Sequence, residues 1–369
     1  MTLVSALVFL TSGGLSVAQE QELLMSKMKP VRVAVVGLTH THVHWILGRA
    51  KDKGDIQIVG VYEPNEDLAK RYLKRHGFDM SLHFTDPETM LDKTKPQAVT
   101  LFGSICEHTG QTRLAAARGI HVMVEKPLAV SLEDARTMRD ATREAGVHLL
   151  TNYETTWYAS NTAAHQMAAD GKLGAIRRVV VNCGHPGPIE IGCNKEFLDW
   201  LTDPQESGGG ALTDFGCYGA NLMTWLMDNR RPDSVYAVTL QTKPDLYPDV
   251  DDDATIVLDY GDAVCVVQAS WSWTSSRKDM AVYGTDASVE TVGGDMLIVR
   301  QSEKDPTRRK AAALKPMQGD PFTHLAAVVR GATEPNALSS IENNMIVMEI
   351  LDAAKRSAES GERITLGSK

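Results

Sequence analysis

The segment Glu125-Lys126-Pro127 places a carboxylate and an ammonium group side by side after the apolar run 121–124. Such a run predicts a buried parallel strand, and the carboxyl end of that strand is where an open α/β sheet presents chemistry to a ligand. Pro127 prevents the strand from continuing, and a helix is expected to begin at Ser131. The segment therefore predicts a catalytic site at a strand end.

A second cluster starts at three consecutive glycines, 208–210, and runs through Asp214 to Tyr218. If a helix begins near Asp214, residues four positions apart share one face and can address one substrate. Together with Lys126, these residues predict that a lysine, an aspartate and a tyrosine converge on one pocket. Each also has a structural alternative: Lys126 can pair with Glu125, Asp214 can cap the helix, and Tyr218 can pack in the core.

The elements that must position these groups alternate between strands and helices, which predicts a parallel, doubly wound sheet. The loops after its strands, at Gly37, Glu63, Gly103 and Glu125, are expected on one carboxyl edge. We expect strands at 31–36, 56–62, 98–102, 121–124 and 147–150, and helices at 44–50, 66–76, 111–118 and 131–145.

The loop after the first strand, Gly37-Leu-Thr39-His40-Thr41-His42, resembles a dinucleotide fingerprint that keeps only its first glycine. The threonine hydroxyls can replace backbone amides as donors to a pyrophosphate. Glu63 ends the next strand, where a carboxylate accepts the ribose hydroxyls and repels a 2′-phosphate. We therefore expect NAD rather than NADP.

The alternating histidines 40, 42 and 44 could also hold a metal ion. A helix beginning near Val43 would make the rings diverge, and the local sequence offers no carboxylate or cysteine to complete a ligand set. We therefore favour a polar loop beside phosphate, with His40 or His42 capping the helix or donating to the cofactor, and expect no metal.

These motifs together resemble the Gfo/Idh/MocA oxidoreductases, which include glucose–fructose oxidoreductase and inositol dehydrogenase. The resemblance runs from about Val31 to the C-terminus and includes the glycine-poor turn, Glu63 and the segment with His108. It continues through 119–129, Gly-Lys-Leu-Gly at 171–174, Trp200, the block 208–214 and the helix segment 353–361.

The resemblance implies an NAD-binding Rossmann domain, assigned to 31–150, and a substrate-binding and oligomerisation domain at 151–369. The second domain is expected to be α+β with a large open, mostly antiparallel sheet and a subunit interface. The sequence agrees, since β-rich runs occur at 177–182, 234–242, 254–260, 263–271 and 279–283.

The resemblance also implies site residues. Lys126 is expected to contact a reacting hydroxyl and Asp214 to orient a sugar. Tyr218 stands where histidine is common in the family, and we expect Lys126 to lower its pKa so that it accepts the proton. Cofactor contacts are expected from Gly37, Thr39, His40, Thr41, His42, Glu63, Ser104, His108, Glu125 and Lys126. Substrate contacts are expected from Tyr153, Trp157, His185, Asp199 and Trp200.

Composition restricts the partners. The net charge of -9 argues against nucleic-acid binding. The acidic run 249–253 could bind a cation, but a solvated loop is expected instead. The family's arginine after the Asn152-Tyr153 strand is absent, replaced by Thr155-Thr156, so a neutral sugar or glycoside is favoured over an acidic one.

Residues 1–18 read as a secretory signal ending near Ala18, although no basic residue precedes the apolar segment. We therefore expect a periplasmic or secreted protein without membrane insertion after cleavage, or a cytoplasmic one if the leader is not a signal. Outside the cytoplasm there is no free NAD pool, so the cofactor would be held tightly.

Two reactions use the same residues: oxidation of a ring hydroxyl, at C3 by expectation, or redox-neutral glycoside hydrolysis through transient oxidation and elimination. A minor alternative is a non-catalytic sugar or nucleotide sensor.

Overall fold

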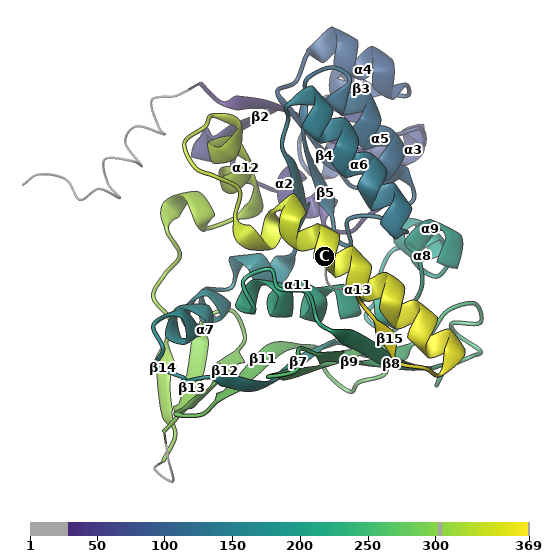
Figure 1. Cartoon of the computed structure of the whole chain (residues 1–369). Coiled ribbons are helices and arrows are strands. Elements are labelled where there is room, and N and C mark those ends of the chain that lie inside the picture. Colours follow the sequence, from purple (N-terminus) through teal and green to yellow (C-terminus); the bar gives the residue numbers. More distant parts are fainter. Residues whose placement is uncertain (1–28, 302–304, 368–369) are drawn as a thin grey trace, which may run out of the picture.

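The computed structural model describes residues 29–301 and 305–367, so the leader at 1–18 lies outside the described residues. Its first sheet is parallel, in the order β3-β2-β1-β4-β5-β6 (Figure 1). The doubly wound sheet predicted from the sequence is confirmed. Its strands are β1 (Val31–Val36), β2 (Ile56–Tyr62), β3 (His83–Phe84), β4 (Ala98–Leu101), β5 (His121–Glu125) and β6 (Leu149–Asn152).

Three helices of this half begin where a polar side chain accepts a backbone N–H group. Asn65 caps α3, Asp86 caps α4 and Ser131 caps α6. The two-residue strand β3 and helix α4 were not predicted, because β3 is too short to show a periodic pattern. The bounds are α2 (Val43–Leu47), α3 (Glu66–Arg75), α4 (Pro87–Thr94), α5 (Glu107–Ala116) and α6 (Leu132–Ala145), with 3-10 turns η1 (Lys51–Lys53), η2 (Met80–Leu82) and η3 (Glu154–Trp157).

The second sheet has the order β14-β13-β12-β11-β7-β10-β9-β8-β15 and is antiparallel except where β7 pairs with β10. The five β-rich runs predicted from the sequence correspond to β7–β11, whereas β12–β15 were not predicted. The bounds are β7 (Ile176–Gly184), β8 (Ser234–Leu240), β9 (Asp253–Asp259), β10 (Val264–Ser270), β11 (Arg277–Gly284), β12 (Ser288–Val292), β13 (Met296–Arg300), β14 (Thr307–Lys310) and β15 (Ile364–Thr365).

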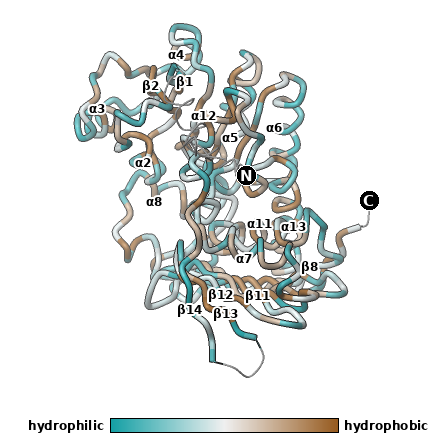
Figure 2. Tube along the Cα trace, turned by 90° about the vertical axis from the view of Figure 1, so that its left-hand side faces the viewer, coloured by the Kyte–Doolittle hydropathy of each residue, from teal (hydrophilic) through white to brown (hydrophobic). Residues whose placement is uncertain are grey.

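Helices α11 and α13 lie between this sheet and the first one (Figure 1), and apolar segments gather at that junction (Figure 2). Helix α12 packs against the first sheet, where Arg49 on the α2–β2 connection binds Asp55 and Asp320. The bounds are α7 (Ala159–Ala169), α8 (Lys195–Leu201), α9 (Pro204–Ser207), α10 (Ala211–Asp214), α11 (Gly216–Leu226), α12 (Pro321–Val329) and α13 (Ile341–Ser360), with η4 (Pro316–Gln318) and η5 (Ala337–Ser339).

The acidic run is not a solvated loop, so that prediction is wrong at two positions. Asp252 is fully buried and accepts the backbone N–H groups of Thr242 and Lys243. Asp251 accepts those of Gly210 and Leu212, at the start of α10. These carboxylates satisfy buried backbone donors, and Asp251 anchors the segment that carries Asp214.

Among the residues that the structure describes, no helix combines the length and apolar character that a membrane span requires.

Candidate active site

The ammonium group of Lys126 is buried at the end of β5 and forms an ion pair with the Asp214 carboxylate. It also donates to the backbone oxygen of Asp214 at 3.2 Å. The other carboxylate oxygen accepts the Trp271 indole N–H at 2.9 Å. Both oxygens of Asp214 therefore have protein donors, which places this residue as the holder of Lys126. A carboxylate has about four acceptor sites, so the expectation that Asp214 also orients a sugar stays a prediction.

The pair keeps both groups charged although both are buried. Burial alone would raise the pKa of Asp214, but the Lys126 ammonium outweighs it and the pKa of Asp214 is lowered. Burial would likewise lower the pKa of Lys126, but Asp214 reverses that effect and the pKa of Lys126 is raised. A fixed, desolvated ammonium can stabilise negative charge that develops on a nearby oxygen.

Tyr218, on α11, lies against this pair. The Lys126 ammonium is 5.3 Å from its ring centroid, and the ammonium of Lys278 is 5.0 Å from it. Even so, burial, followed by the carboxylate of Glu154, raises the pKa of Tyr218 well above its usual value. The expected lowering of the Tyr218 pKa is therefore wrong, because desolvation by burial is the largest influence on it.

The backbone conformation of the glycine-poor loop requires a glycine at position 37. Gly37 has φ 78°, and a Cβ there would lie 2.6 Å from the backbone nitrogen of Gly103. Glu63, at the end of β2, accepts the backbone N–H groups of Leu38 and Asn65, both at 2.9 Å. These bonds hold the carboxylate beside the loop, at the strand edge where a ribose would lie.

Unpartnered polar atoms at this edge are suited to a dinucleotide. Within the described residues, the Thr39 hydroxyl and His108 Nε2 are buried without a hydrogen-bond partner. His108 donates through Nδ1 to the Leu128 carbonyl, so its Nε2 is an acceptor. Thr41 lies in the turn before α2, whereas the Ser104 hydroxyl donates to Glu206 at 2.7 Å.

The prediction that the three histidine rings diverge is only partly correct. His44 turns to His76, while His40 and His42 stay together, with Glu125 Oε2 3.0 Å from His42 Nδ1. The local sequence showed no carboxylate, but the fold supplies one, and ligand atoms of His40, His42 and Glu125 lie within 4.8 Å of one another.

Hydrogen bonds already occupy this cluster. His40 Nδ1 accepts the His42 backbone N–H at 3.1 Å, so the neutral His40 ring carries its proton on Nε2. Burial lowers the pKa of His42 to about 3 and raises the pKa of Glu125, and His42 Nδ1 lies 3.0 Å from Glu125 Oε2. Glu125 in turn accepts from Asn152 at 2.8 Å. A metal ion would have to replace these bonds, so the contacts favour a hydrogen-bonded cluster over a metal site.

The structure separates the five expected substrate residues. His185 is half-buried beside Phe215, with ring centroids 4.9 Å apart, and lines an open cavity. Trp157 donates to Asn152, and Trp200 packs near His40. The predictions for the other two residues are wrong, because their polar groups bind elsewhere. The Tyr153 hydroxyl donates to Asn344 on α13, and exposed Asp199 pairs with Lys195 on the surface of α8.

Lys278 and Glu154 were missed by sequence reasoning. They form an ion pair beside Tyr218 although they lie 124 residues apart, and no local motif marks either one.

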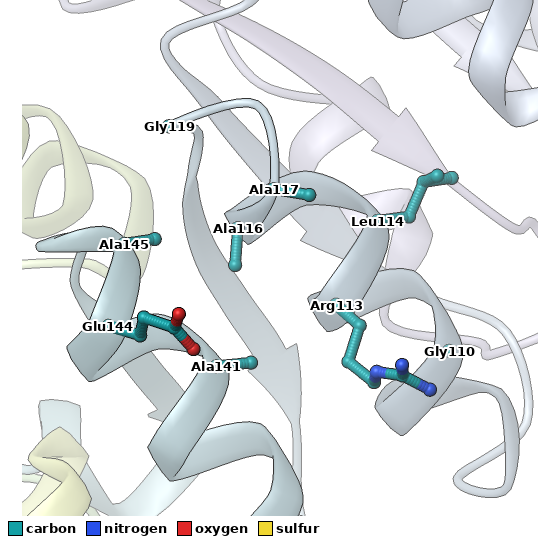
Figure 3. A pocket seen from close by; sticks show the side chains of 9 residues that line it. All are labelled: Gly110, Arg113, Leu114, Ala116, Ala117, Gly119, Ala141, Glu144 and Ala145. Atoms are coloured by element: carbon teal, nitrogen blue, oxygen red, sulfur yellow. The ribbon is translucent and has the colours of Figure 1, made fainter.

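A separate hollow of 750 Å³ between α5 and α6 has mainly small residues in its lining (Figure 3). Its charged side chains are Arg113 and Glu144, and it contains none of the groups described above.

Comparisons with known proteins agree with this arrangement. A model of the oxidoreductase-family NAD-binding Rossmann fold matches residues 31–153, and a model of the GFO/IDH/MocA C-terminal domain matches residues 161–290.

Two curated relatives are 27% identical to this chain. One is the 1,5-anhydro-D-fructose reductase of Ensifer adhaerens, over 204 residues (55% of this chain and 59% of the relative). The other is the D-glucoside 3-dehydrogenase of Escherichia coli K12, over 216 residues (58% of each). The chain thus spans less than three fifths of the length of either relative.

Solved structures show the same fold. The aldose-aldose oxidoreductase from Caulobacter crescentus superposes with TM-score 0.79 at 23% identity, covering 92% of this chain and 100% of that one. An inositol dehydrogenase homolog from Azotobacter vinelandii with NAD+ gives 0.78 at 21%, covering 92% and 98%. From the two matched models and the shared fold, we conclude that this chain belongs to the Gfo/Idh/MocA family of NAD-binding oxidoreductases.

Proposed function

We propose that this protein is an NAD-dependent dehydrogenase that oxidises a secondary ring hydroxyl of a neutral sugar or glycoside, at C3, to a ketone. The observation that carries the proposal is the buried Lys126–Asp214 pair beside Tyr218, at the same sheet edge as Glu63 and the Gly37 loop. Relatives that act on glucosides and other sugars support the substrate class.

The residues divide the work as follows. NAD accepts the hydride from the substrate carbon when bound. Lys126 donates to the reacting oxygen and stabilises its developing negative charge, while Asp214 and Trp271 fix the position of the ammonium. Tyr218 accepts the hydroxyl proton, either as a phenolate or as the first member of a proton relay.

The raised pKa of Tyr218 gives a pH prediction. If its phenolate is the base, turnover should rise by about tenfold per pH unit through the alkaline range, because the phenolate fraction grows until the pH reaches the pKa. Tyr218→Phe should lower kcat at least ~10-fold and remove that rise while leaving NAD affinity intact. A pH–rate profile that is the same in both proteins would show that Tyr218 is not the base.

Glu63 should determine the affinity for NAD. Glu63→Ala removes the carboxylate expected to accept the ribose hydroxyls, so the Kd for NAD should rise at least ~10-fold. NADP should bind no worse, since its 2′-phosphate no longer meets a negative charge. Isothermal titration with both nucleotides measures this, with exposed Glu133→Ala on α6 as the control. An equal loss of affinity for both would indicate general damage to the site.

One experiment separates the proposed reaction from its alternatives. Nucleotide that co-purifies is released and identified, and the protein is then incubated with a glycoside panel while ketone and free aglycone are assayed together. Ketone formation supports the dehydrogenase. Release of aglycone without net redox change would instead identify a redox-neutral glycoside hydrolase, and binding without turnover would identify a sensor.

The proposal includes export and self-association. Export rests on the leader at 1–18 and would require tightly held NAD. Self-association is supported by the outer face of the second sheet, where Tyr236, Val238 and Leu240 on β8, Tyr283 on β11 and Val292 on β12 are 39–54% exposed.

A further inference from the structure

A cavity of about 950 Å³ opens beside the catalytic groups. Glu154, His185 and Lys278 line it, together with Asn182 and Asp279 from neighbouring strands of the second sheet. Its size is at the upper end of the range for small-molecule sites. Since Lys278 also lies 5.0 Å from the ring of Tyr218, the cavity and the proposed reaction centre are adjacent.

The Lys278–Glu154 ion pair joins elements from both halves of the chain. Lys278 is at the start of β11, and Glu154 opens η3 directly after the last strand of the first sheet. Glu154 also accepts the Tyr158 hydroxyl, which restricts its carboxylate. An ammonium has three donors and a carboxylate about four acceptor sites, so the pair retains hydrogen-bonding capacity for a ligand.

The charges that line the cavity are balanced. Lys278 pairs with Glu154, and Arg277 pairs with Asp279. The remaining acidic lining residue, Glu290, pairs with Arg300. Every cation in the described lining therefore has a carboxylate partner, which leaves no free positive charge for an anionic substrate. His185 is neutral there, since burial lowers its pKa, and its Nδ1 accepts the Gly187 N–H, which leaves Nε2–H as a donor.

We propose that the Lys278–Glu154 pair is the substrate-positioning device of this site, with Lys278 donating to and Glu154 accepting from neighbouring hydroxyls of a neutral, polyhydroxylated ring. The ring is thereby oriented so that its reacting hydroxyl meets Lys126 and Tyr218. This inference rests on the proposed function, because it names the groups that select and orient that substrate.

The test compares Lys278→Met, Lys278→Arg and Glu154→Gln in the full-length, NAD-loaded protein. The probes are methyl β-D-glucoside and D-glucuronate, and the readouts are ketone formation, direct binding by calorimetry, and NAD affinity. Lys278→Met should lower kcat/KM for the glucoside by roughly 10- to 100-fold, the effect of losing a hydrogen bond from a charged group. NAD affinity should not change, and Lys278→Arg should restore part of the loss.

Lys310→Met is the control, because exposed Lys310 on β14 pairs with Asp295 and lies outside the cavity lining. Its effect should be below about twofold, as for a solvent-exposed ion pair. Normal turnover in Lys278→Met would overturn the inference while leaving the proposed function intact. Binding of the glucoside that depends on Lys278, without turnover in the wild-type protein, would support the inference and refute the proposed dehydrogenase. Preference for glucuronate, or absence of binding to both probes, would overturn the inference.

Discussion

Lys126→Met should reduce kcat by about 10³-fold, because it removes the fixed ammonium that stabilises the developing negative charge on the reacting oxygen. It should also lower the free energy of unfolding by about 3–5 kcal/mol, since it leaves the buried Asp214 carboxylate without a counter-charge. Single-turnover assays and urea unfolding measure the two effects. Lys172→Met, which breaks a surface ion pair with Asp170, should change stability by no more than about 0.5 kcal/mol.

The stability loss should depend on pH in a defined direction. In the wild-type protein the pKa of Asp214 is lowered and that of Lys126 is raised, so the pair stabilises the fold between these two pKa values. That contribution falls as pH drops through the folded-state pKa of Asp214 or rises through that of Lys126.

In Lys126→Met, burial raises the pKa of Asp214 above its unfolded value, so the carboxyl can protonate at mildly acidic pH. The variant should therefore be less destabilised at pH 5 than at pH 8. Adding Asp214→Asn should recover stability at pH 8 but not turnover. An equal loss at both pH values, or recovered turnover in the double variant, would contradict the assigned roles.

Gly210→Ala should strongly destabilise the segment that carries Asp214. A Cβ at this position would overlap the backbone carbonyl of Asp251, a group that cannot move because it accepts the Ala211 N–H at 2.9 Å. The Asp251 carboxylate also accepts the N–H groups of Gly210 and Leu212. We expect a loss of about 3 kcal/mol or more in stability, together with a large loss of turnover, because α10 carries Asp214.

The control is Gly110→Ala, in the middle of α5, where a Cβ meets nothing within 4 Å. This change should raise stability by roughly 0.5–1 kcal/mol through the unfolded chain and the helix propensity. Thermal unfolding of both variants measures these changes in stability. A Gly210→Ala protein as stable as the wild type would show that the segment carrying Asp214 can shift without cost.

Local patterns predicted the framework of the site well. The apolar runs before Gly37, Glu63 and Glu125 marked strand ends, because buried parallel strands are continuously hydrophobic and turn residues stop them. The two-residue strands β3 and β15 are too short to show a pattern, and the strands β12–β14 were also missed. The acidic run was misread because charge suggests solvent, whereas Asp251 and Asp252 bind backbone N–H groups that sequence alone cannot locate.

Sequence by itself determined that a lysine at the end of a strand, an aspartate and a tyrosine were the candidate chemistry, since residue type and position along a strand are local properties. Tertiary structure decided what each one does. It brought Lys126 to Asp214 across 88 residues and Lys278 to Glu154 across 124, and it directed Tyr153 and Asp199 elsewhere. It also raised the pKa of Tyr218, because desolvation depends on the whole surrounding fold rather than on neighbours in the chain.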